Sequence, residues 1–366
     1  MTQPKLKIRE LRKTYGPVVA LGTASIEMPE GEFLTLLGPS GSGKTTMLMM
    51  IAGLAQPDSG EVWIDGKLAT YAPPHKRDIG VVFQNYALFP HLTVFENIAF
   101  PLRMRGTPEA DIRREVGRVL DLIQLSHVGG RLPRALSGGQ QQRIALARCI
   151  VYRPSIVLMD EPLGALDKKL RDQMKLEIKR LHEELGITVL YVTHDQEEAM
   201  IMSDRICLMN NARIEQIGTP TDLYFRPQTT FAADFLGESN LLDASVENID
   251  ASEIALRSAS GGMVHAVRDP ARSFAVGDKV KVMVRPEMIS VLTPEGTEDN
   301  VAEVRLTDAI LVGGVTKYYG KLPDGSEISA TDLTRGPLPA TARDSVLRFG
   351  WPKHSAVVLP TGERAQ

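Results

Sequence analysis

The sequence is poor in cysteine and has no long apolar run. Its only two cysteines, Cys149 and Cys207, lie far apart in separate apolar stretches. Isolated cysteines of this kind behave as small buried hydrophobes in a reducing compartment. No uninterrupted apolar stretch reaches the roughly 18 residues of a membrane-spanning helix, and the opening MTQPKLKIRE lacks the apolar segment of a secretory signal. We therefore expect a cytoplasmic protein that meets a membrane only through a partner.

Neither sign of charge dominates the chain. The net charge is −3, with 24% charged and 43% hydrophobic residues, which is typical of an ordinary soluble globular protein. Binding nucleic acid irrespective of its sequence needs a basic surface, so we expect no nucleic-acid partner. The length of 366 residues exceeds one ordinary core and predicts two domains.

Short apolar runs alternate with helical patterns in the first part of the chain. The runs Phe33–Leu37, Ile156–Met159 and Thr188–Val192 precede helices expected after Lys44, over Lys168–Leu185 and over Gln196–Ser203. This alternation predicts an α/β fold with a largely parallel sheet. A flanking antiparallel β layer is suggested by the stretches Leu11 to Leu36 and Gly60 to Ile64. A helical subdomain is expected at about residues 85–136.

The pattern changes near residues 237–242. Short strands separated by glycine, proline and aspartate follow, and almost no helical periodicity remains; they are Lys279–Val284, Ser290–Leu292, Glu303–Leu306, Thr316–Tyr319 and Ala356–Leu359. This pattern predicts a small β-barrel or sandwich. We place one domain at residues 1–237 and a β-rich domain at 238–366.

A phosphate-binding loop is predicted between the first buried strand and the first helix. Gly38 to Thr45 match the pattern G-x-x-x-x-G-K-S/T in that context. Glycines let successive N–H groups surround phosphate oxygens, and the helix N-terminus favours the anion. We expect Lys44 to reach the β- and γ-phosphates and Thr45 to ligate Mg²⁺, whereas a mere glycine-rich turn before a lysine is disfavoured. The predicted nucleotide-binding residues here are Gly38, Pro39, Ser40, Gly41, Ser42, Gly43, Lys44, Thr45 and Thr46.

A second candidate is the acidic pair Asp160-Glu161 at the end of an apolar strand. Ligands of doubly wound sheets bind at that edge. Alone, the pair fits a cap or a surface site equally well, but the upstream loop favours function. We expect Asp160 to hold Mg²⁺ through water, and Glu161 to polarise the water that attacks the γ-phosphate.

A third candidate lies before the helix that ends near Pro154. Ser137 is a good N-cap, and the two following glycines leave N–H groups unshielded for a second phosphate. The string Leu136-Ser-Gly-Gly-Gln resembles the signature of ABC-type nucleotide-binding domains. This resemblance implies that the nucleotide is ATP. It also implies that four signature residues bind the nucleotide, namely Ser137, Gly138, Gly139 and Gln140.

Four further residues match the pattern of that family in order. Tyr15 resembles the aromatic that stacks on adenine, and Gln84 the glutamine that senses Mg²⁺ and the attacking water. Asp167 resembles the end of the loop that communicates between subunits, and His194 the histidine on the γ-phosphate. Alone, such a tyrosine is as often a core or surface residue, and such a histidine is more often structural, but the Thr-His-Asp context of His194 favours function. The resemblance covers roughly residues 1–235 and implies a P-loop NTPase ABC cassette.

The resemblance also implies partners. Two copies would pack head to tail, so that Ser137–Gln140 of one closes over ATP on the loop of the other. Aromatic residues between 84 and 101 resemble the groove that receives a helix from each of two membrane permeases, although their default interpretation is core. The homodimer would sit peripherally on the cytoplasmic face of the inner membrane, and an extracytoplasmic substrate-binding protein would act indirectly.

The β-rich part resembles the OB-like accessory domain of maltose, polyamine and ferric-ion importers, mainly through Val284–Glu287 and Gly313-Gly314. The strings Pro73–Asp78 and Phe235–Asn240 are most like the spermidine/putrescine branch. Importers of sugar, ferric ion or another small solute remain alternatives. So does a soluble non-transport ABC ATPase, although the chain has neither sustained heptads nor a second signature.

Overall fold

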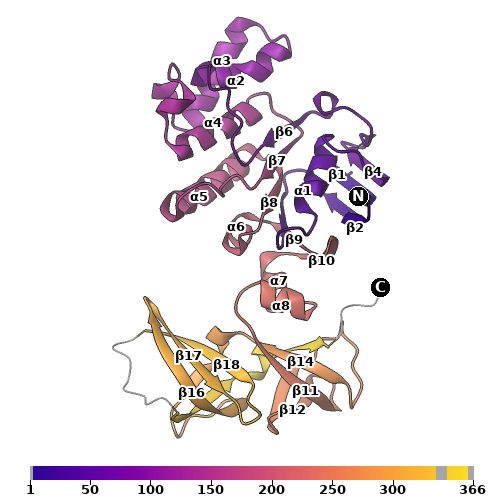
Figure 1. Cartoon of the computed structure of the whole chain (residues 1–366), viewed down its shortest axis with the longest axis vertical. Coiled ribbons are helices and arrows are strands. Elements are labelled where there is room, and N and C mark those ends of the chain that lie inside the picture. The colour runs from indigo at the N-terminus through magenta and orange to yellow at the C-terminus, as the bar shows by residue number, and fades with distance from the viewer. Residues whose placement is uncertain (1–2, 335–343, 362–366) are drawn as a thin grey trace. The chain divides into compact units, whose positions relative to one another are not determined.

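The computed structural model describes residues 3–334 and 344–361. The chain divides into two compact units, Met1–Pro220 and Thr221–Gln366. Figure 1 shows a mixed helix-and-sheet first unit and a β-rich second unit. Each unit is considered separately.

A six-stranded sheet forms the centre of the first unit. Its strand order is β10-β9-β3-β8-β7-β6, with parallel pairing except between β9 and β10. The strands are β3 (Phe33–Leu37), β6 (Ile79–Val82), β7 (Ile156–Asp160), β8 (Thr188–Thr193), β9 (Arg205–Asn210) and β10 (Arg213–Gly218). All residues of β3 and β8 are buried, which is why these strands read as continuous apolar runs. The predicted parallel sheet is confirmed.

A four-stranded antiparallel sheet accompanies it, in the order β2-β1-β4-β5. It comprises β1 (Leu6–Tyr15), β2 (Val18–Met28), β4 (Ser59–Ile64) and β5 (Lys67–Leu68). Helix α1 (Lys44–Ala52) shares one core with both sheets through residues such as Met47 and Leu48. The phosphate-loop helix is therefore held between two sheets.

Helices of the first unit form a second core. Helices α2 (Val94–Met104), α3 (Glu109–Leu122) and α4 (Gly138–Ile150) make up the helical region drawn at the upper end of Figure 1. They share buried residues with α5 (Lys168–Leu185), and α6 (Gln196–Met202) adds Met202 to the same cluster. The bounds of α5 are those predicted from the sequence, and α6 ends one residue earlier.

The second unit consists of two five-stranded antiparallel sheets around one core that includes Phe349 and Trp351. Two short helices, α7 (Pro220–Phe225) and α8 (Thr230–Phe235), precede the strands. One sheet has the order β13-β12-β11-β14-β20, with β11 Asn240–Ile249, β12 Glu253–Ser258, β13 Met263–Val267, β14 Lys279–Val284 and β20 Val357–Pro360. The other has the order β15-β19-β16-β17-β18, with β15 Ser290–Leu292, β16 Asn300–Val312, β17 Val315–Lys321, β18 Glu327–Leu333 and β19 Val346–Trp351.

Candidate functional site

The predicted catalytic residues follow the carboxyl ends of neighbouring parallel strands. The strands β3, β8, β7 and β6 are adjacent in the sheet, and the last three are labelled in Figure 1. Lys44 follows β3 through the phosphate loop, His194 follows β8 and Glu161 follows β7. Gln84 lies two residues beyond β6. The carboxyl edge of a parallel sheet, where ligands of such folds bind, therefore carries all four.

Close backbone contacts explain two of the loop glycines. A Cβ on Gly38 would lie 2.1 Å from the Met209 carbonyl oxygen, and one on Gly43 would lie 2.7 Å from that of Ala20. Gly43 also has a φ of +99°, which side chains rarely adopt. Larger residues would displace the loop from β9 and β2, so the glycines fix where α1 begins.

Lys44 turns back onto its own loop. Its Nζ donates to the carbonyl oxygens of Gly38 at 2.8 Å and Pro39 at 2.9 Å, and Lys44 is only 5% exposed. Burial lowers the pKa of Lys44, while the negative charges of Glu161 and Asp160 act in the opposite sense. The loop thus holds a desolvated cation where a phosphate-binding loop places its ligand.

The other loop residues differ in exposure. Ser42 is buried, Pro39 and Thr46 are partly buried, and Ser40, Gly41 and Thr45 are exposed. The exposed members can meet a ligand, whereas the buried ones shape the loop.

Two of the predicted metal ligands touch. Thr45 Oγ1 donates to Asp160 Oδ1 at 3.2 Å. Burial raises the pKa of Asp160, and the Glu161 charge adds to this. Within residues 3–334 and 344–361, no three histidine, cysteine, aspartate or glutamate side chains gather as a metal site. The oxygens present suit Mg²⁺, which is commonly held by one or two protein groups and completed by phosphate and water.

The remaining catalytic candidates surround Glu161. Its Oε1 lies 3.2 Å from His194 Nδ1. Glu161 has a φ of +43° and its N–H donates to the Val192 carbonyl at 3.0 Å, which ties the strained residue to β8. A Cβ on Gly164 would lie 3.5 Å both from Gln84 Nε2 and from the Glu161 carbonyl oxygen. Gln84, Glu161 and His194 therefore belong to one cluster.

The signature opens α4. Ser137 and Gln140 form a capping box, since each side chain accepts a hydrogen bond from the backbone N–H of the other. A Cβ on Gly139 would lie 2.8 Å from Leu170 Cδ1, and one on Gly138 3.3 Å from Leu166 Cδ2. The signature glycines therefore lie against the turn that contains Asp167.

Asp167 and Tyr15 have other surroundings. Asp167 caps α5, accepting from the Leu170 N–H at 3.0 Å, and is exposed. Tyr15 ends β1 and is 56% exposed, with Lys13 Nζ 5.3 Å from its ring centre. An exposed tyrosine face next to a cation is available to an aromatic ligand.

Sequence reasoning missed Glu198. This carboxylate is 3% exposed and accepts from Tyr191 Oη at 2.8 Å and Thr193 Oγ1 at 2.7 Å. Thr193 Oγ1 in turn accepts from the Asp195 N–H at 3.0 Å. This network fixes the turn that carries His194. The glutamate looks like an ordinary first-turn helix residue in the sequence, which gives no signal of it.

Comparison with known families adds to this geometry. The ABC transporter family model matches residues 21–164, and the TOBE domain model matches residues 282–359. The second match confirms the predicted OB-like accessory domain.

Full-length relatives agree with the family models. The spermidine/putrescine import ATP-binding protein PotA of Ruegeria pomeroyi is 47% identical, covering 99% of this chain and 95% of the relative. The protein of the same name from Rubrobacter xylanophilus is 44% identical, covering 97% and 93%.

Solved structures resemble about three fifths of the chain. Clostridium perfringens CbiO1, part of an ABC transporter complex, gives a TM-score of 0.57 at 28% identity, covering 61% of this chain and 91% of that chain. The dimeric structure of MJ0796, a bacterial ABC transporter cassette, gives a TM-score of 0.53 at 36% identity, covering 59% of this chain and 98% of that chain.

The chain therefore belongs to the ABC transporter family. Within that family it is an ATP-binding subunit of the import type and an ATPase. No helix in the parts of the chain that the structure describes is long and apolar enough to cross a bilayer.

Proposed function

We propose that this ATPase powers the uptake of polyamines such as spermidine and putrescine through partner permeases. The observation that carries the ATPase part is the cluster of Lys44, Asp160, Glu161 and His194 at one sheet edge. The cargo rests on the names of the relatives, which are 42–47% identical over most of their length.

In this proposal the loop binds the triphosphate of ATP and Tyr15 stacks on adenine. Lys44 exchanges its bonds to the loop carbonyls for the β- and γ-phosphates. Mg²⁺ would be held by Thr45, Gln84 and Asp160, and when bound it would neutralise charge on the β- and γ-phosphates. The Thr45–Asp160 hydrogen bond supports this assignment, because it places two oxygen atoms that can ligate a cation side by side.

Glu161 acts as the general base. Its carboxylate accepts a proton from the attacking water, while Gln84 orients that water and His194 contacts the γ-phosphate. The 3.2 Å approach of His194 Nδ1 to Glu161 Oε1 supports a shared site, since each restrains the other. Phosphoryl transfer depends more on such positioning than on covalent chemistry.

The second ATP-facing element is the capped N-terminus of α4. Ser137, Gly138, Gly139 and Gln140 would close over ATP bound to the loop of a second copy, and Asp167 would lie at the same interface. The similar cassette MJ0796 is dimeric in a post-hydrolysis state bound to ADP and Pi, which supports this arrangement. ATP binding would then close the homodimer and hydrolysis reopen it.

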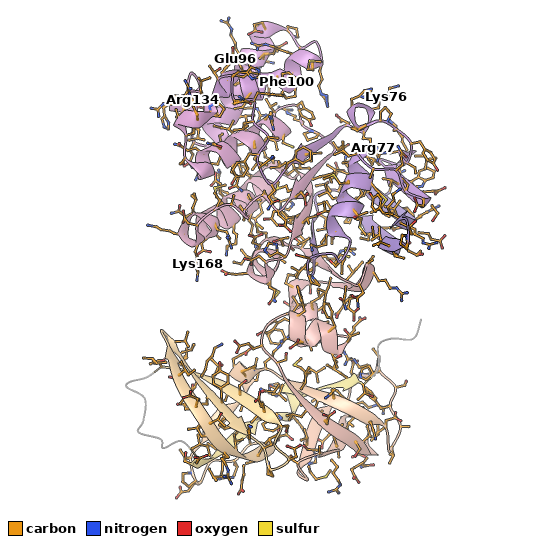
Figure 2. All side chains as sticks on the ribbon, in the orientation of Figure 1. Lys76, Arg77, Glu96, Phe100, Arg134 and Lys168 are labelled. Carbon is orange, nitrogen blue, oxygen red and sulfur yellow. The ribbon has the colours of Figure 1, made fainter. Side chains whose placement is uncertain are left out.

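The permeases would dock near residues 84–101. Phe89 and Phe100 pack with ring centres 4.7 Å apart, and Phe100 is exposed on α2 (Figure 2). Met104, at the end of that helix, is 72% exposed. Apolar groups of this kind anchor a helix in a groove, so the dimer would lie peripherally on the cytoplasmic face of the membrane.

The catalytic assignment is tested by Glu161→Gln. We expect ATP binding to persist and hydrolysis to fall by roughly 10²–10⁴-fold, with an ATP-bound dimer accumulating on size-exclusion chromatography. Glu183→Gln, which alters an exposed carboxylate of α5, is the control. Turnover near the wild-type rate in Glu161→Gln would reject the base.

The cargo is tested separately. Deleting the gene should abolish uptake of labelled spermidine and putrescine, and the wild-type chain but not Glu161→Gln should restore it. If polyamine uptake stays intact and maltose or ferric-ion uptake is lost, the proposed cargo is wrong. The ATPase assignment would remain unchanged.

A further inference from the structure

A strained turn follows Gln84. Tyr86 and Ala87 have φ values of +60° and +46°, in the left-handed region that L side chains rarely adopt. Tyr86 is 7% exposed, and its hydroxyl is buried with no hydrogen-bond partner among the residues that the structure describes. Strain of this kind persists only where the surroundings enforce it.

Arg148 enforces it. Its two terminal nitrogens donate to the carbonyl oxygens of Ala87 at 2.8 Å and Tyr86 at 3.0 Å. The planar guanidinium can bind two neighbouring acceptors at once, which a lysine ammonium does less rigidly. Burial lowers the pKa of Arg148, yet an arginine stays charged in a protein. The partly buried guanidinium of Arg148 therefore donates its hydrogen bonds to two backbone carbonyls.

Arg148 also joins regions that the proposed mechanism uses separately. It lies on α4, the helix that begins after the Ser137 cap. Its guanidinium carbon is 5.5 Å from the ring centre of Phe89, and Phe89 packs on Phe100 in the candidate permease-docking region. The signature helix, the docking aromatics and the turn after Gln84 therefore meet at one side chain.

We propose that Arg148 is a positioning residue for Gln84. It holds the Tyr86–Ala87 turn in its strained conformation and thereby transmits movement of α4 and of the docking aromatics to Gln84. The inference rests on the proposed role of Gln84 at Mg²⁺ and the attacking water.

The test uses the full-length chain and the variant Arg148→Lys, which keeps the positive charge. We expect kcat to fall about tenfold, the scale of a typical coupling between contacting residues. KM for ATP should change less than about twofold, because the phosphate loop is untouched. The Mg²⁺ dependence of the rate should shift to higher concentration. Arg143→Lys is the matched control, since Arg143 lies on the same helix and donates at 3.5 Å to the Ile123 carbonyl.

A double-mutant cycle with Gln84→Ala separates positioning from general stability. If Arg148 acts through Gln84, Arg148→Lys should slow the Gln84→Ala enzyme little further. If the two effects multiply, or if Arg143→Lys behaves as Arg148→Lys does, the inference is overturned. A Gln84→Ala variant that keeps the wild-type rate and Mg²⁺ dependence would refute the proposed role of Gln84 instead.

A rescue variant tests the strain directly. Glycine adopts a positive φ without penalty. Ala87→Gly should therefore favour the turn even without the two hydrogen bonds from Arg148. We expect Arg148→Lys/Ala87→Gly to regain most of the lost kcat. No recovery, with the melting temperature unchanged across the series, would contradict a role through the turn.

Discussion

Glu198 shows how a residue outside the motifs supports the site. Its buried carboxylate accepts two hydroxyl hydrogen bonds, yet burial dominates and raises its pKa. Those hydroxyls belong to Tyr191 and Thr193, which immediately precede His194 on β8. A buried carboxyl group is therefore kept where ionisation is disfavoured, because its oxygen fixes the turn that carries His194.

Because the pKa of Glu198 is raised, its contribution to the free energy of unfolding depends on pH. Between the ordinary glutamate pKa, about 4.3, and the raised value, the folded chain binds more protons than the unfolded chain. The stabilisation from Glu198 is therefore complete below the ordinary pKa and is lost as pH rises through the raised one.

We predict the consequence for Glu198→Gln, which keeps an acceptor oxygen but cannot ionise. The unfolding free energy of the variant relative to wild type should increase as pH rises from about 4.3 towards 7. Urea unfolding at several pH values measures it, with Glu183→Gln as control. A pH-independent difference would show that Glu198 does not titrate in this way.

Tyr15 offers a second test at the level of a single residue. We predict that Tyr15→Ala weakens ATP binding by about 1–3 kcal/mol, the loss typical of an aromatic that stacks on a base. Tripolyphosphate should bind as before, because the phosphate loop is unchanged. Calorimetric titration measures both ligands, and Tyr71→Ala alters another exposed tyrosine as control. Equal ATP affinity of Tyr15→Ala and wild type would remove Tyr15 from the site.

The sequence predicts the candidate residues of this site, but not the residues that hold them in position. Lys44 and Glu161 were found because local motifs place them directly after strands. Arg148 binds the Ala87 carbonyl 61 residues away along the chain, and Glu198 matters through β8 side chains. Such contacts depend on which elements pack together, which local spacing does not reveal.

At the scale of elements, amphipathic order decided what could be predicted. The predicted bounds of α5 and of β14 agree with the structure, because an eighteen-residue helical pattern and a strand that opens with alternating lysine and valine are strong signals. Strands β11, β12, β13, β18 and β19 were not predicted. Of these, β11, β12, β13 and β18 each pair with a strand next to them in sequence, whereas β19 pairs with the more distant β15 and β16.

Helix α2 offers a test of local capping. Thr93 Oγ1 accepts from the Glu96 N–H at 3.2 Å, and Glu96 Oε2 accepts from the Thr93 N–H at 2.8 Å. We predict that Thr93→Ala lowers the local unfolding free energy of α2 by about 1 kcal/mol, measured by amide hydrogen exchange. Thr93→Ser should retain most of it. The same loss in both variants would assign the effect to packing.

At the scale of the whole molecule, the division into units follows contacts distant in sequence. The boundary predicted near residue 237 lies after α8, whereas the structural division lies after Pro220. Within the second unit, Arg285 of the segment after β14 donates to the carbonyl oxygens of Ala233 and Tyr224, each at 2.9 Å. A buried arginine thus ties α7 and α8 to the β-rich unit, which no local pattern in those helices indicates.

The proposed head-to-tail dimer makes a prediction that a self-contained site does not. Lys44→Ala disables the phosphate loop and leaves the signature intact. Gly138→Asp puts a negative charge at the exposed start of α4 and leaves the loop intact. Each variant alone should be inactive, because every composite site of its homodimer is damaged.

An equimolar mixture of the two should regain activity. In a mixed dimer, the intact loop of the Gly138→Asp chain faces the intact signature of the Lys44→Ala chain. Random pairing then restores about a quarter of the wild-type sites, by the symmetry of a two-fold dimer. ATPase rates of the mixture and of each variant measure this, and Gly138→Ala controls for the added side chain, whose Cβ would lie 3.3 Å from Leu166 Cδ2. If the mixture is as inactive as its components while both variants still dimerise, the proposed composite site of the head-to-tail dimer is rejected.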